Sequence, residues 1–208
     1  MPYSSYSSLS NQLHKELGTQ TWFNGLSGYL LLRYGPIERR MLEASRYVEI
    51  HPDNKKAFSY EFSSIVRDIG SVFGSLMQHL LEKTASGNKE YTIDDFTKFL
   101  IDKVKDIELI GLSLQIPFQH NFVLPFEGIK SRMPPKTKLL WWEPYNNLKH
   151  SDIKNYKDGS LANAIYGIST LAVLHILMDP YTRLVGESDL FYKCGYYAPI
   201  DEAKKDLF

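Results

Sequence analysis

The stretch that decides the fold is FSYEFSSIVRDIGSVFGSLMQHLL, residues 58–81. Its apolar residues recur at steps of three and four, the spacing of one face of an α-helix. The pattern predicts a helix of about seven turns that ends near Ser86-Gly87 and packs its apolar face against a core. The residues on that face are Phe58, Phe62, Ile65, Val66, Ile69, Val72, Phe73, Leu76, Met77, Leu80 and Leu81.

A second long helix is predicted nearer the carboxyl end, where residues 161–176 are apolar nearly all round. A helix without a polar face is typical of the centre of a fold, so we expect this one to be buried. Asp158-Gly159-Ser160 caps its start and Asp179-Pro180 ends it. Between the two helices, the capping-box spacing of Thr92 and Asp95 predicts the start of a shorter one.

The N-terminal part of the chain is less regular. A leucine at every fourth position over residues 9–17 predicts a short first helix. Asn24-Gly25 lies between apolar stretches, as in the turn of a hairpin, and predicts a small β element within residues 19–34. Pro36 suits the first turn of a helix that continues to residue 44 or beyond.

Prolines exclude a long helix between residues 107 and 144, so we expect extended chain there with a strand or two. The aromatic tail, residues 181–208, predicts turns and a short helix over 201–207. These patterns predict an all-α fold, an antiparallel helical bundle with a long core helix and a small β or irregular excursion. We expect one domain over residues 1–208, with an N-terminal appendage (1–52), a helical core (53–180) and the C-terminal tail.

The composition narrows the function. Lys plus Arg and Asp plus Glu number 24 each, so the formal net charge is zero and a broadly basic surface is not expected. The single cysteine, Cys194, excludes an internal disulfide and a zinc site built on several thiolates. The six histidines are scattered and no phosphate-binding glycine loop occurs, so no metal or other cofactor is predicted. Without a signal-peptide pattern or a membrane-spanning apolar stretch, we expect a cytoplasmic protein with no membrane contact.

Two groups of polar residues are candidates for chemistry. The segment LLWWEPYNNLKH, residues 139–150, is the most distinctive, since as a helix it places Tyr145, Asn146, Lys149 and His150 together. An imidazole, an ammonium and amide donors suit phosphate binding and proton transfer. The competing interpretation is that both Trp fix the segment to the core while Asn and His satisfy backbone groups.

The second group lies on the long helix, where Glu61, Asp68 and His79 follow one flank. Carboxylates near a histidine can tune its pKa and form an acid/base pair with it. The simpler interpretation is a polar edge beside the apolar face.

Residues 139–150 resemble a segment of bacterial HEPN-type proteins. The resemblance rests on Tyr-Asn-x-x-Lys-His after a Trp-Trp pair and a Pro pair, followed by a short polar loop and a Leu-Ala-Asn-Ala helix, and it covers roughly residues 57–178. HEPN domains are all-α bundles, and many are metal-independent endoribonucleases of defence and toxin–antitoxin systems. Their signature is an Arg, often followed by Asn, with a His four to six residues after the Arg.

The resemblance implies an RNA-directed protein that forms a homodimer, with two motifs facing one cleft. It implies that His150 is the general acid/base and that Asn146 and Lys149 act beside it. The binding residues that it implies are Tyr145, Trp142, Arg67 and Asn163.

One departure from the HEPN signature weakens the expectation of catalysis. The Arg position falls on Tyr145, and a phenol cannot replace a guanidinium in stabilising charge on a phosphate. Removing such a donor costs about a hundred- to a thousand-fold in rate. We therefore expect weakened or lost cleavage, unless Lys149 or Arg67 supplies the charge.

Two other functions are compatible with the sequence. The first is a non-catalytic helical module that binds a protein partner, which the zero net charge and the missing Arg favour. The second is a small-molecule pocket lined by Trp141, Trp142 and Tyr145.

Overall fold

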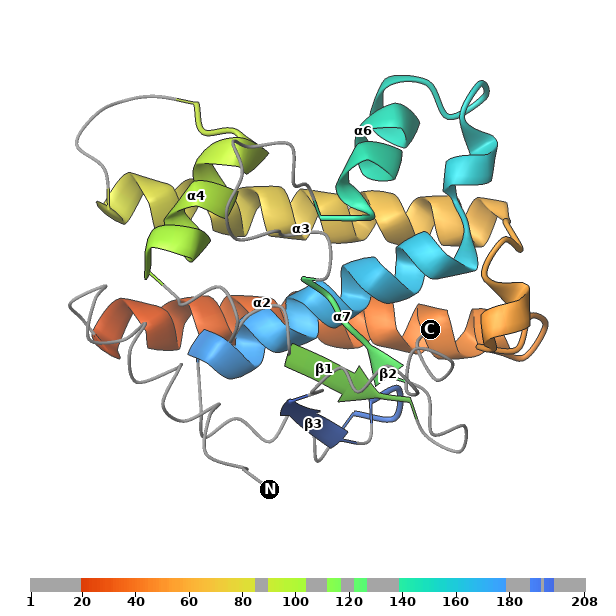
Figure 1. Cartoon of the computed structure of the whole chain (residues 1–208), viewed down its shortest axis with the longest axis horizontal. Coiled ribbons are helices and arrows are strands. Elements are labelled where there is room, and N and C mark those ends of the chain that lie inside the picture. Colours follow the sequence, from red (N-terminus) through yellow and green to blue (C-terminus); the bar gives the residue numbers. More distant parts are fainter. Residues whose placement is uncertain are drawn as a thin grey trace.

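The computed structural model describes residues 20–84, 90–103, 112–116, 122–126, 139–178, 188–191 and 193–196. Its body is built from three long helices, α2 (Gln20–Ser45), α3 (Tyr60–Thr84) and α7 (Leu161–Met178), which all pack against one another. In Figure 1, α2 runs in the direction opposite to α3 and α7. The predicted helical bundle with a long core helix is confirmed, and α7 is buried at its centre as predicted.

The long helix α3 begins two residues later than its apolar pattern. The Ser59 hydroxyl accepts a hydrogen bond from the backbone N–H of Phe62 at 3.0 Å, so Ser59 caps the helix. Phe58 therefore lies outside the helix and is exposed, whereas every other member of the predicted apolar face is buried.

Two shorter helices pack on α3, namely α4 (Ile93–Lys103) and α6 (Trp142–His150). In Figure 1, α6 lies on the side of α3 away from α2, whereas α4 crosses α3. The predicted capping box of α4 is present, because the Thr92 N–H donates to Asp95 Oδ2 at 2.9 Å and the Asp95 N–H donates to Thr92 Oγ1 at 3.3 Å. Two 3₁₀ turns, η1 (Pro52–Asn54) and η2 (Tyr156–Asp158), precede α3 and α7.

A small antiparallel sheet packs on α7. Its strands are β1 (Leu112–Gln115), β2 (Phe122–Val123) and β3 (Lys193–Tyr196), in the order β2-β1-β3. The first two are the strands expected between residues 107 and 144. The third comes from the C-terminal tail, where Leu114 pairs with Cys194.

The tail is also fixed to α2, just before β3. Glu38 Oε1 accepts hydrogen bonds from the hydroxyls of Tyr34, at 3.2 Å, and Ser188. Leu190 and Phe191, shortly after Ser188, are buried in the core.

The predicted hairpin within residues 19–34 is wrong, since α2 runs unbroken from Gln20 to Ser45 with Pro36 inside it. Asn-Gly is only a local turn signal, and it is outweighed here by long-range packing. Four residues of α2 at helical spacing enter the core, so this helix, expected in the appendage, is part of the bundle. They are Leu30, Tyr34, Ile37 and Met41. The helices predicted over 9–17 and 201–207 lie outside the described residues.

Candidate functional site

Two tryptophans hold the start of α6 against the core. Trp141 is fully buried, and its indole N–H donates to Thr170 Oγ1 of α7 at 2.9 Å. The centroids of Trp141 and Trp142 are both 5.3 Å from the ring centroid of Phe73 on α3. The interpretation that the Trp pair fixes this segment to the core is therefore confirmed. Trp142 is buried in the same contact, so its predicted binding role is not supported by its position.

Tyr145 is buried on the inner side of α6, with 8% of its surface exposed. Its ring lies so close to Gly70 of α3 that a Cβ at that position would overlap it. Burial raises the pKa of the Tyr145 hydroxyl. The prediction that Tyr145 shares a binding face with Asn146 and His150 is wrong, because the tyrosine fills the contact between α3 and α6.

The other predicted residues of α6 lie on its outer side. Lys149 and His150 are exposed, and Asn146 is half-buried. Their spacing of three and four residues places them on one side of the helix, which we call the outer face of α6. Within the part of the chain that the structure describes, none of the three has a hydrogen-bond or ion-pair partner.

The loop after His150 is held to α6 by amide side chains. Asn147 Nδ2 donates to Asp158 Oδ2 at 2.8 Å, and Asn155 Nδ2 donates to the Asn147 carbonyl at 2.9 Å. Asn163 Nδ2 donates to the Asp158 carbonyl at 2.8 Å. Asn163 therefore closes this loop, and its predicted binding role is not supported by its position.

Arg67 reaches the same end of α6 from α3. Its Nη1 lies 3.0 Å from Oδ2 of Asp152, which is two residues after His150. The ion pair neutralises the negative charge of Asp152 beside the outer face. It also occupies the guanidinium of Arg67, which was predicted to bind phosphate.

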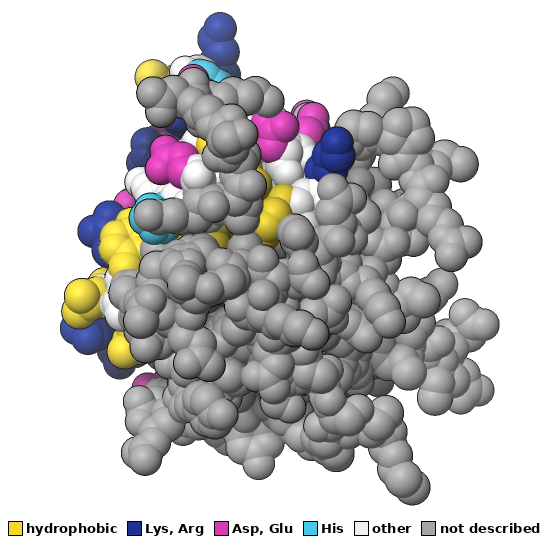
Figure 2. Space-filling view, turned by 90° about the vertical axis from the view of Figure 1, so that its left-hand side faces the viewer, with side chains coloured by type: hydrophobic (Ala, Val, Ile, Leu, Met, Phe, Trp, Pro, Cys, Tyr) yellow, Lys and Arg dark blue, Asp and Glu magenta, His cyan; other side chains and the backbone are white. Residues whose placement is uncertain are grey.

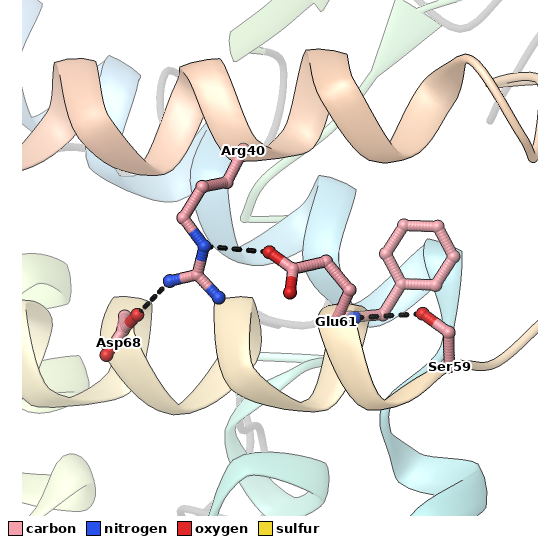
Figure 3. Close-up of polar contacts among 5 residues, drawn as sticks. Arg40, Ser59, Glu61 and Asp68 are labelled. Carbon is pink, nitrogen blue, oxygen red and sulfur yellow. Dashed lines mark hydrogen bonds and ion pairs between the residues drawn. The ribbon is translucent and has the colours of Figure 1, made fainter.

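A second polar cluster joins α2 to α3 (Figure 3). Arg40 of α2 points toward α3, where its Nε lies 2.7 Å from Glu61 Oε1 and its Nη1 binds Asp68. The hydrogen bond to Glu61 is the main cause that raises the pKa of Arg40. We call these three residues the Arg40 cluster. Sequence analysis found both carboxylates but missed Arg40, which lies 21 and 28 positions before them.

Two hollows open near the start of α3, and Ser59 borders both. One, of about 630 Å³, is lined by charged and polar residues that include Arg40, Glu43 and Tyr47. The other, of about 340 Å³, is lined by Phe58, Ser59, Tyr60, Ser63 and Tyr156. The small-molecule pocket expected at the Trp pair is instead filled by packed rings.

The charges of the described surface are mixed. Figure 2 shows described basic and acidic side chains among hydrophobic ones on that face, without a patch of one charge. Among the described residues, no group of three or more His, Cys, Asp or Glu side chains is placed to hold a metal ion. Of the helices described, none combines the length and hydropathy needed to cross a membrane.

Comparisons of the chain with protein-family models, with curated proteins and with solved structures gave no match.

Proposed function

We propose that this chain is a HEPN-like protein that binds RNA through the outer face of α6, with weak or lost cleavage. The observation that supports this function is the exposure of Asn146, Lys149 and His150 on one side of a helix without partners among the described residues. The buried residues of α6, Trp142, Tyr145 and Leu148, lie on its inner side and pack the helix against the core. An amide, an ammonium and an imidazole together suit a phosphate diester.

Weak cleavage is expected because no guanidinium is placed to stabilise the phosphate, either at the signature Arg position or from α3. Tyr145 stands at the signature Arg position but is buried, so it cannot approach a phosphate. Arg67 is close to the end of α6 but is paired with Asp152. His150 can then move a proton, while among the described residues of α6 the cation that can stabilise charge developing on the phosphate is Lys149.

RNA binding is tested by fluorescence anisotropy with labelled RNA over a range of salt concentrations. Lys149→Ala should weaken binding to single strands and make the slope of log affinity against log salt shallower by about 0.7, the value for one lost phosphate contact. Lys98→Ala removes an equally exposed lysine from α4 and is the matched control. The proposal fails if the wild type does not bind, or if the two variants bind equally.

Cleavage is tested on the same RNA in EDTA. We expect at most slow production of 2′,3′-cyclic ends by the wild type, and none by His150→Ala. Fast cleavage that His150→Ala retains would contradict the assignment of His150 as the acid/base.

A second candidate, a non-catalytic interaction module, is favoured by one observation. Leu31 and Leu32 are adjacent on α2 and expose 51% and 77% of their surface. Neighbouring exposed leucines fit a protein contact, and a homodimer through them is compatible with both candidates. The interaction module replaces the proposed function if this contact forms and the wild type binds no RNA. Sedimentation should show a dimer that Leu32→Glu dissociates, while Ile153→Glu, at an apolar position that is 91% exposed, leaves it intact.

A further inference from the structure

We propose that the RNA is single-stranded and that its bases stack on an aromatic platform formed by Phe58, Tyr60 and Tyr156. The inference rests on the proposed function, because it names the kind of RNA that the same region binds.

The platform consists of rings that the fold leaves open to solvent. Phe58 is 47% exposed, Tyr60 84% and Tyr156 41%. The rings of Phe58 and Tyr156 meet edge to face, with their centroids 5.2 Å apart. Together the three border the hollow of about 340 Å³, a volume within the range of about 300–1,000 Å³ that ligand pockets occupy.

Backbone hydrogen bonds hold these rings side by side. Phe58 forms an isolated antiparallel bridge with Ser160, and the Ser59 N–H donates to the Gly159 carbonyl at 3.1 Å. Gly159 passes so close to α3 that a Cβ there would lie 2.8 Å from the Ser63 Cα. These contacts fix the backbone on which Phe58 and Tyr156 are placed before any ligand binds, which lowers the entropy cost of binding.

The platform is joined to the outer face of α6. The hydrogen bonds from Asn147 to Asp158 and from Asn155 to the Asn147 carbonyl fold η2, with Tyr156, back onto the end of the helix that carries His150. In the proposed binding mode, one phosphate of the strand contacts the outer face and bases of neighbouring nucleotides stack on the platform.

Charge around the platform favours a polyanion. Lys149, Lys154 and Lys157 are exposed without an ion pair in the described residues, and the Lys157 Nζ lies 5.9 Å from the centroid of the Tyr156 ring. Of the two acids in the same loop, Asp152 is paired with Arg67, and Asp158 accepts a hydrogen bond from Asn147 Nδ2, so the three lysines outnumber the one acid without an ion pair among the described residues. Protein–protein interfaces are depleted in lysine, whereas single-strand sites combine stacking aromatics with basic side chains. A duplex keeps its bases stacked on one another, so it offers none to the rings.

The test compares a labelled single-stranded RNA of about 12 nucleotides with a blunt duplex of the same sequence. Tyr156→Leu and Phe58→Leu keep an apolar side chain but remove the ring. Each should weaken single-strand binding about five- to 150-fold, the range reported for loss of one stacked base, and leave duplex binding and the salt slope unchanged. Tyr156→Phe keeps the ring and should bind like the wild type.

Ile153→Ala is the matched control, since Ile153 is 91% exposed in the same loop but has no aromatic face. If both leucine variants bind single strands like the wild type while Lys149→Ala is weakened, the platform inference is overturned and the proposed function stands. If the wild type binds no RNA, both are overturned. An equal loss of RNA affinity in Ile153→Ala would overturn stacking. Stacking would also be overturned if Tyr156→Leu changed the sedimentation of the protein without changing its RNA affinity, because the platform would then be a protein contact.

Discussion

The Arg40 cluster and the outer face of α6 are both polar, but they differ in whether their polar side chains have partners. In the Arg40 cluster one guanidinium joins two carboxylates of the neighbouring helix. On the outer face, Lys149 and His150 extend from the last turn of α6 and have no partner among the described residues.

The difference separates residues that hold the bundle together from residues that are available to a ligand. A charge paired between helices contributes to the free energy of folding, although modestly when it is exposed. A charge without a partner contributes almost nothing to folding and keeps its capacity for binding. The following substitutions test this contrast, starting with the contact that fixes α6 itself.

The largest effect is expected for Gly70→Ala. A Cβ at this position overlaps the Tyr145 ring, so α6 must shift, and we expect a loss of about 1–3 kcal/mol in the free energy of unfolding. Gly74→Ala, one turn further along α3, meets nothing within 4 Å and should instead gain about 0.5–1 kcal/mol. Urea denaturation measures both. Equal effects of the two alanines would contradict the close contact between α3 and α6.

The Arg40 cluster is tested by Arg40→Met. Losing two partly exposed ion pairs should cost about 1 kcal/mol of unfolding free energy, and less at high salt. Arg67→Met loses the single pair with Asp152 and should cost less. Urea denaturation at low and high salt distinguishes the two variants. A larger cost for Arg67→Met would contradict the expectation that the Arg40 cluster stabilises the fold more than the single pair does.

An alkaline pH dependence is expected from Tyr145. Because burial raises its pKa in the folded state, the folded chain holds this proton more tightly than the unfolded chain does. The stabilisation is complete below the unfolded pKa, about 10, and is lost as the pH rises through the folded pKa. Between about pH 8 and 10.5 the wild type should lose more stability than Tyr145→Phe, by less than about 1 kcal/mol. Identical losses in the two proteins would place the hydroxyl in solvent.

The smallest effect on stability is expected on the outer face. His150→Ala and Asn146→Ala should each change the free energy of unfolding by no more than about 0.5 kcal/mol, because neither side chain has a partner to lose. The same variants should lose RNA affinity. A large loss of stability in His150→Ala would instead make His150 a structural residue.

The helices with the clearest patterns were predictable from the sequence. The apolar face of α3 and the all-round apolar α7 report burial directly, and the local capping box at Thr92 marks the start of α4. The hairpin failed because Asn24-Gly25 is a signal of two residues, whereas α2 is stabilised by contacts with α3 and α7 that are distant in sequence.

The candidate site was predictable only as a segment. Residues 139–150 are unusual, but which of them face inward depends on how α6 lies on α3, and Gly70 decides this by admitting the Tyr145 ring. The Arg40 cluster and the aromatic platform each combine residues from separate elements, so spacing along the chain does not reveal them.

The sheet sets an order for folding as the chain leaves the ribosome. Strand β1 pairs with β2 within the next few residues, but its other partner, β3, lies near the carboxyl end, and α2 likewise must await α7. Contacts between segments so far apart close late and slow folding. Until α7 and β3 have been synthesised, one edge of β1 and the part of α2 that packs on α7 stay uncovered, so the nascent chain is prone to misassociation before these two elements emerge.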